Sequence, residues 1–133
     1  MTEADYRQLI REMCEAAEFE DWEQLAYARH FEIDGVVAAL LHDEEAAPDT
    51  LTICFQFGDE FDPARHGHLL AYNMTAPASP DGRGAFGVMP DQDRVAYRTD
   101  LSWQSPMAGS DLFQLLTRHL RSAQAALQES FGA

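Results

Sequence analysis

Residues 27–42 read YARHFEIDGVVAALLH, and this stretch decides the fold. Its centre, Asp34-Gly35, is the strongest short signal for a β-hairpin, because a type I′ turn needs a positive φ at both central positions. Before the turn, side chains alternate with a period of two, which predicts a strand with one shared face: Tyr27, Phe31 and Ile33. After the turn, residues 36–42 are apolar on both faces. A strand of that kind is covered twice, so it is expected in the middle of a sheet or beneath a partner.

Two more stretches of the chain alternate in the same way. Residues 43–49 are acidic and contain a proline, which predicts a loop before the next strand. That strand, 50–57, has the cleanest alternation in the chain, with an apolar inner face: Leu51, Ile53, Phe55 and Phe57. A second hairpin is expected over 86–101, with its turn at Pro90-Asp91-Gln92 and one face made by Val95, Tyr97, Thr99 and Leu101.

Helical periodicity flanks these strands. Residues 3–18 carry apolar side chains at helical spacing, and Thr2 with Asp5 has the spacing of a capping box. Residues 19–22 are expected to form the hinge that follows. Residues 63–73 predict a short helix, because Asp62-Pro63 is an N-cap followed by proline at the first helical position.

The last helix is expected after Ser110, its predicted N-cap, and carries a leucine-rich stripe that reaches towards Phe131. The predicted order is therefore α-β-β-β-α-β-β-α. Residues 75–84 are expected to form a loop, and no linker or internal repeat divides the chain. The economical packing is one α+β domain, residues 1–133, with a twisted antiparallel sheet covered by helices.

The composition limits the partners. Lys and Arg total 9 against 23 Asp and Glu, which gives a formal charge of −14. A negative field repels nucleic acid and anionic membranes, and it favours basic or mixed-charge proteins. No apolar stretch is long enough to span a membrane, and the acidic N-terminus lacks a signal peptide, so a cytoplasmic protein is expected. Cys14 and Cys54 have no motif spacing and are expected to be reduced, packed thiols.

The chain has no recognisable catalytic or cofactor motif. His66-x-His68 is the best metal candidate, but residues two apart on a helix point in different directions, so solvent-facing histidines are the preferred interpretation. Cys14 lies beside the apolar stripe of the first helix, which favours an inert thiol over a nucleophile. The acidic run 43–45 lacks the ligand rhythm of a calcium loop, and the glycines at 82–87 suit turns better than a phosphate site. We therefore expect no enzymatic activity, no metal and no cofactor.

Apolar surface is the feature that needs a function. Residues 36–41 are apolar on both faces, and Leu69, Leu70, Tyr72 and Met74 end a helix too short to be stable alone. Phe113 lies off the main stripe of the last helix. One core could absorb all of these residues. The alternative, which we favour, is a protein partner, because large exposed apolar patches mark interaction sites.

The element order, length and acidity resemble the class I type III secretion chaperones, the group that includes the Tir and Yop effector chaperones. The likeness spans essentially the whole chain. Its matches are the strand, Asp-Gly turn and strand over 31–36, the strand from Leu51 to Gly58, and the closing helix. The family's short helix usually reads Leu-Leu-x-x-Asn, and Leu69-Leu70-Ala71-Tyr72-Asn73 stands in that place. The first helix is followed by residues 19–22 where the family often has Leu-Gly.

The resemblance implies a homodimer that keeps the N-terminal segment of a secreted effector partly extended in the bacterial cytoplasm. It implies a dimer interface drawn from the short helix and the later strands: Leu69, Leu70, Tyr72, Val95 and Tyr97. It also implies that the effector binds near the first helix and the sheet, partly as an added strand. The residues implied there are Leu9, Met13, Phe31, Ile33 and Val37.

Two other functions remain open from the sequence. A regulatory or adaptor domain of the same fold would bind a folded partner and would ignore an extended peptide. A small enzyme or ligand carrier would retain a cofactor on purification.

Overall fold

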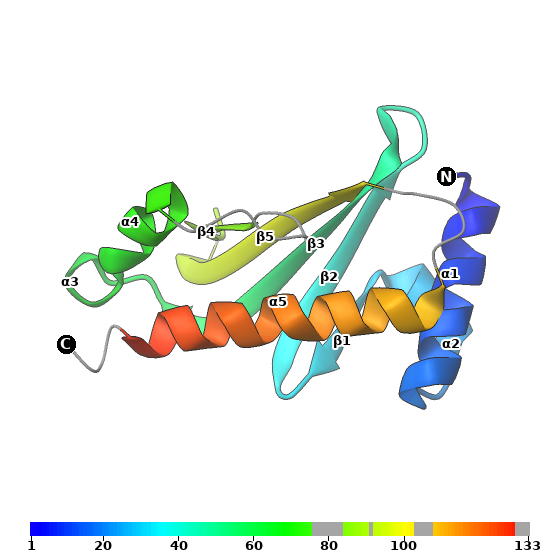
Figure 1. Cartoon of the computed structure of the whole chain (residues 1–133), viewed down its shortest axis with the longest axis horizontal. Coiled ribbons are helices and arrows are strands. Elements are labelled where there is room, and N and C mark those ends of the chain that lie inside the picture. Colours follow the sequence, from blue (N-terminus) through cyan, green and yellow to red (C-terminus); the bar gives the residue numbers. More distant parts are fainter. Residues whose placement is uncertain (76–83, 91, 103–107, 130–133) are drawn as a thin grey trace.

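The computed structural model describes residues 1–75, 84–90, 92–102 and 108–129 as one α+β domain (Figure 1). Five helices and five strands are present in these residues. In chain order they are α1 (Glu3–Ala17), α2 (Trp22–Ala28), β1 (His30–Ile33), β2 (Val36–Asp43), β3 (Ala47–Glu60), α3 (Pro63–His66), α4 (His68–Thr75), β4 (Gly84–Val88), β5 (Arg94–Ser102) and α5 (Gly109–Glu129). The α+β class and the order of the main elements are those expected from the sequence.

All strands join one antiparallel sheet in the order β1-β2-β3-β5-β4. The first hairpin is the predicted one, since Asp34 and Gly35 have φ of 51° and 80° and Ile33 pairs with Val36. β3 is the central strand, and its predicted inner residues are all buried: Leu51, Ile53, Phe55 and Phe57. This pairing leaves β1 and β4 as the two edges of the sheet.

One face of the sheet carries the core. α5 runs along this inner face, with α1 and α2 at one end of the molecule and α3 and α4 at the other (Figure 1). The buried stripe of α5 is the leucine-rich one expected from the sequence: Leu112, Leu116, Leu120, Ala123 and Leu127. At its start, α5 approaches α1 so closely that a side chain at Gly109 would collide with the backbone of Glu12 and Met13. The two helices therefore pack on each other as well as on the sheet.

The N-terminus of α1 is held by several polar contacts. Thr2 and Asp5 form the predicted capping box, in which each side chain accepts from the other residue's backbone N–H, at 3.1 and 3.0 Å. The hydrogen bond from the Thr2 backbone N–H, together with the Thr2 side chain, holds the pKa of the Asp5 carboxyl below its ordinary value. The terminal ammonium lies 3.2 Å from Asp49 in β3. α1 is therefore tied to the β2–β3 hairpin.

The hinge expected after the first helix is present at residues 19–21, but Trp22 lies outside it and the prediction of a strand from Tyr27 was wrong. Asp21 caps a seven-residue helix, α2, whose buried residues are Leu25 and Ala26. Tyr27 belongs to this helix and is 81 % exposed, so it does not share a face with Phe31. The signal that was missed is the i, i+3, i+4 spacing of Trp22, Leu25 and Ala26, which is that of a helix. Arg7 and Arg11 both lie over the Trp22 ring at 5.6 Å, which holds α2 against α1.

Three smaller expectations also differ from the structure. β3 begins at Ala47, because Asp43 accepts from the amides of Glu45 and Ala46 and closes a tight hairpin within the predicted loop. The short helix is divided at Gly67 into α3 and α4. α5 already begins at Gly109, and Asp111 rather than Ser110 accepts from the Ala108 amide. Most of the predicted loop 75–84, with Asp91 and Phe131, lies outside the described residues.

Candidate protein-binding surfaces

The residues expected to bind an effector divide into two groups. Leu9 and Met13 are 2 % and 0 % exposed because α5 and the sheet cover the apolar stripe of α1, and Ile33 in β1 is 8 % exposed on the inner face of the sheet. These three residues belong to the core and present no surface to a partner in this fold. Phe31 and Val37 are half-buried and remain accessible, on opposite faces of the first hairpin.

The residues expected at a dimer interface divide in the same way. Leu69, Val95 and Tyr97 lie in the core, and Tyr72 is half-buried because its ring meets Phe86 edge-on at 5.5 Å. Only Leu70 is open, with 60 % of its surface exposed. Met74, one turn further along α4, is also exposed, so α4 presents an apolar face that the described part of the chain does not cover.

The outer edge of β1 has backbone groups that can pair with another strand. The Leu40 N–H donates to the Arg29 carbonyl at 2.7 Å, which fixes the hydrogen-bonded positions of this pair. Because such positions alternate along an antiparallel ladder, His30 and Glu32 point their N–H and C=O groups away from β2. Among the described residues, no strand pairs with this edge. An extended segment of another chain could therefore hydrogen-bond here.

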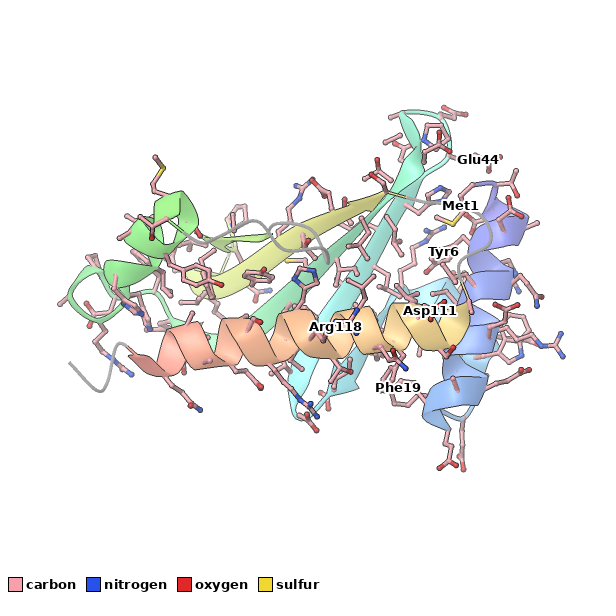
Figure 2. The ribbon with its side chains drawn as sticks, in the orientation of Figure 1. Met1, Tyr6, Phe19, Glu44, Asp111 and Arg118 are labelled. Atoms are coloured by element: carbon pink, nitrogen blue, oxygen red, sulfur yellow. The ribbon has the colours of Figure 1, made fainter. Side chains whose placement is uncertain are left out.

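An aromatic cluster lies on the inner side of this edge. The Phe19 ring is 5.4 Å from Phe31 in β1 and 5.9 Å from Phe113 in α5, and all three residues are only partly buried. Phe19 lies between α2 and α5 in Figure 2. The side chains of an added strand would alternate between this cluster and the outer face beside Glu32. The sequence identified Phe31 and Phe113 as apolar but did not predict that they belong to one cluster. Phe19, the residue that contacts both, had been assigned to the hinge.

The outer face of the sheet is the second accessible surface. β2 is an interior strand as predicted, but only one of its faces is buried, the face that carries Ala38 and Leu40. On the other face, Leu41 is 52 % exposed and Val37 and Ala39 are half-buried. The prediction of a strand covered twice is therefore wrong for the chain alone. The apolar pattern of residues 36–41 could not distinguish a strand packed on both faces from a strand with one accessible apolar face.

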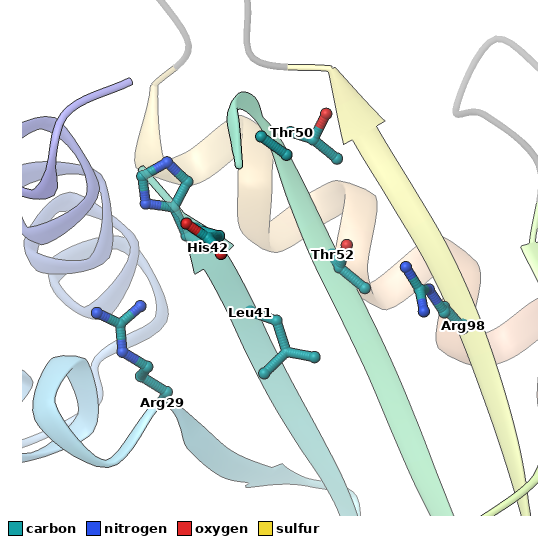
Figure 3. Close-up of a pocket in the computed structure, with 8 residues that line it drawn as sticks. Arg29, Leu41, His42, Thr50, Thr52 and Arg98 are labelled. Carbon is teal, nitrogen blue, oxygen red and sulfur yellow. The ribbon is translucent and has the colours of Figure 1, made fainter. Parts of the chain in front are cut away.

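Two hollows mark this outer face. One, of about 350 Å³, lies over Leu41, Thr50, Thr52 and Arg98 (Figure 3). The other, of about 340 Å³, has an apolar lining that includes Cys54, Ala85, Gly87 and Ala96, and it shares Arg98 with the first. Arg98 is paired with Asp100 at 3.3 Å, and Asp100 also accepts from Thr52 at 2.6 Å. The hollows are shallow depressions that suit side chains of a bound segment.

The histidines and the cysteine that were considered as metal ligands or nucleophiles are buried or hydrogen-bonded within the fold. His66 is fully buried, and its Nδ1 accepts from the Asp62 amide at 2.9 Å. His68 Nε2 lies 2.9 Å from the Ala126 carbonyl, so the expectation of solvent-facing histidines was wrong. In the part of the chain that the structure describes, no group of three or more His, Cys, Asp or Glu side chains could hold a metal ion. Both cysteines are unpaired, and burial raises the pKa of each thiol, which disfavours the thiolate.

None of the helices in the described residues combines the length and apolarity needed to cross a membrane. No family model and no curated protein sequence matches the chain. A solved structure does match it, the crystal structure of the Yersinia pestis type III secretion chaperone SycH in complex with a stable fragment of YscM2. The TM-score is 0.64 and the sequence identity 19 %, over 91 % of this chain and 98 % of that chain. The chain therefore has the fold of a type III secretion chaperone.

Proposed function

We propose that this protein is a secretion chaperone that binds the extended N-terminal segment of a secreted effector and keeps it soluble in the bacterial cytoplasm. The observation that carries the proposal is the unpaired edge of β1, with half-buried aromatic rings beside it. Strand addition uses backbone hydrogen bonds, which tolerate many sequences, and neighbouring pockets then select the side chains. A chaperone for an unfolded segment needs this combination.

The chemistry of the edge indicates the kind of segment that would bind. Alternate side chains of an added strand would meet the cluster of Phe19, Phe31 and Phe113, so they should be apolar. The others would lie on the outer face beside the exposed Glu32, where basic residues fit. The net charge of −14 favours the same choice and increases the rate of association with a basic segment.

The fold match supports the proposal in one further respect. The related structure is of a chaperone with a bound protein fragment, so a chain of this fold can serve as a protein-binding module. Homodimerisation through the exposed face of α4 belongs to the same proposal. Leu70 and Met74 are its candidate residues, in place of the buried Leu69, Val95 and Tyr97.

Co-expression with candidate effectors tests the function directly. We expect a soluble, stoichiometric complex with the N-terminal region of one secreted protein, and an unfolded peptide from that region should compete for the site. Glu32→Pro should abolish the complex, because proline removes an outward N–H from the edge while β1 keeps its bonds to β2. Glu32→Ala is the matched control and should retain the complex.

A regulatory or adaptor domain is the competing function. It would bind a folded protein through the outer face of the sheet, where the two hollows lie. In that case the extended peptide would not compete, and Leu41→Asp would weaken binding more than Glu32→Pro. A folded partner that stays bound in the presence of excess extended peptide would contradict the chaperone proposal.

A further inference from the structure

The second sheet edge, β4, already has a hydrogen-bonding partner. Phe86 stands opposite Tyr97, and both of its backbone groups meet the side-chain amide of Asn73 in α4. The Phe86 N–H donates to Asn73 Oδ1 at 2.7 Å, and Asn73 Nδ2 donates to the Phe86 carbonyl at 2.9 Å. One amide side chain thus makes the pair of bonds that a residue of an adjacent strand would make.

α4 is fixed in this position by contacts on other sides. The Tyr72 ring packs edge-on against Phe86, Leu69 is buried, and His68 contacts the Ala126 carbonyl of α5. A helix held at these points cannot withdraw its Asn73 amide without losing packing. The amide is therefore a permanent competitor for any strand that approaches β4.

We infer that Asn73 closes the β4 edge and so restricts strand pairing, with partners or with other copies of this chain, to β1. The restriction to β1 rests on the proposed function, whereas the closure of β4 can be tested without a partner. An unprotected edge strand is a template for self-association, and proteins with open sheets commonly protect their edge strands against such pairing. Asparagine suits this device because it carries a donor and an acceptor in one planar group.

Three variants separate the two bonds. Asn73→Ala removes both, and Asn73→Asp keeps only the acceptor for the Phe86 N–H. Thr75→Ala is the control, because the Thr75 hydroxyl donates to the Ala71 carbonyl of its own helix at 2.9 Å. All three changes lie on α4, so a general loosening of that helix would affect the control as well.

Hydrogen exchange at the Phe86 amide is the first measurement. We expect exchange about tenfold faster in Asn73→Ala, because the Phe86 N–H loses the hydrogen bond that it donates to Asn73 Oδ1. Asn73→Asp should retain most of the protection, and Thr75→Ala all of it. Unchanged exchange in a folded Asn73→Ala protein would overturn the inference.

Self-association is the second measurement. Sedimentation velocity should show Asn73→Ala forming species larger than the wild type in a concentration-dependent manner, and Asn73→Asp forming fewer. Val88→Lys should remove these species, because Val88 is an exposed residue of the same edge and a lysine there blocks pairing. Fast exchange at Phe86 without larger species would also overturn the inference, since an open edge would then attract no strand. If Asn73→Ala does not fold, the comparison of Asn73→Asp with Thr75→Ala decides by the same two readouts.

These outcomes are independent of effector binding. A wild-type protein that binds no extended segment would remove the proposed function and leave the closure of β4 intact. Larger species in Asn73→Ala that Val88→Lys does not affect would remove the closure and leave the proposed function intact.

Discussion

The two edges of the sheet differ in what lies against them. At β4 a helix supplies an amide and an aromatic ring, and both backbone groups of Phe86 are satisfied within the chain. At β1 the outward groups of His30 and Glu32 have no strand partner among the described residues, and half-buried phenylalanines lie alongside. The difference shows how an open sheet can be specific: one edge is sealed by its own fold and the other is left for a partner.

The largest effect is expected from removing the aromatic ring at the closed edge. Phe86 is 7 % exposed and packs between Tyr72 and Tyr97, so Phe86→Ala should lower the free energy of unfolding by about 3–5 kcal/mol. Phe31→Ala, at the half-buried ring of the open edge, should cost about 1–2 kcal/mol. Urea denaturation of both variants gives the comparison. Equal losses would mean that the two edges do not differ in structural importance.

The sequence revealed the core of this fold more clearly than its edges. The turn at Asp34-Gly35 and the alternation over 51–57 depend on local chemistry, since a turn type or a buried face is written into neighbouring residues. The capping box at Thr2 is of the same kind. Such features could be predicted because no distant residue takes part in them.

The candidate sites depended on distant contacts, and prediction was weaker there. The resemblance implied a binding role for Leu9 and Met13, and nothing in their own helix shows that α5 covers them. Asn73 could be recognised only as the last residue of the Leu-Leu-x-x-Asn pattern, because its two bonds reach a strand residue 13 positions away. The periodicity of a helix shows which residues are apolar, and only the packing shows which of them remain open.

The helix that closes β4 should also carry the dimer interface. Leu70→Asp places a charge on the exposed apolar face of α4, and we expect association to weaken by about a hundredfold, from a dimer to a monomer in light scattering. Leu41→Asp is the matched control, since Leu41 is similarly exposed but lies on the outer face of β2. A dimer that survives Leu70→Asp and dissociates with Leu41→Asp would move the interface to the sheet.

Alkaline pH should loosen the sheet near the closed edge. Burial raises the pKa of Tyr97 to about 12, against 10 for an exposed tyrosine, so the folded state keeps this proton after the unfolded state has lost it. Its contribution is therefore fully present below pH 10 and is lost between pH 10 and 12, with an expected decrease of about 1–2 kcal/mol. Tyr6 has its pKa raised to about 12 by burial as well, so it adds to the same decrease.

Phenylalanine substitution separates the two tyrosines. Tyr97→Phe should make stability less dependent on pH between 10 and 12, and Tyr6→Phe should remove the remaining part, in denaturation curves recorded across this range. A pH dependence that neither variant alters would show that other groups control the alkaline transition.

The smallest effect is expected from the charge beside the open edge. Glu32→Lys should weaken binding of a basic segment by about fivefold, mainly through slower association, because an exposed charge steers encounter more than it holds the complex. The effect should fade as ionic strength rises from 0.05 to roughly 0.5 M, where screening shortens the reach of the charge. Glu45→Lys makes the same change in net charge on the β2–β3 turn, far from this edge, and measures the contribution of the overall field. A difference between the two variants in association rate at low salt would locate the bound segment beside Glu32. Equal rates would show that only the charge of −14 attracts it and that the β1 edge has no local preference for basic residues.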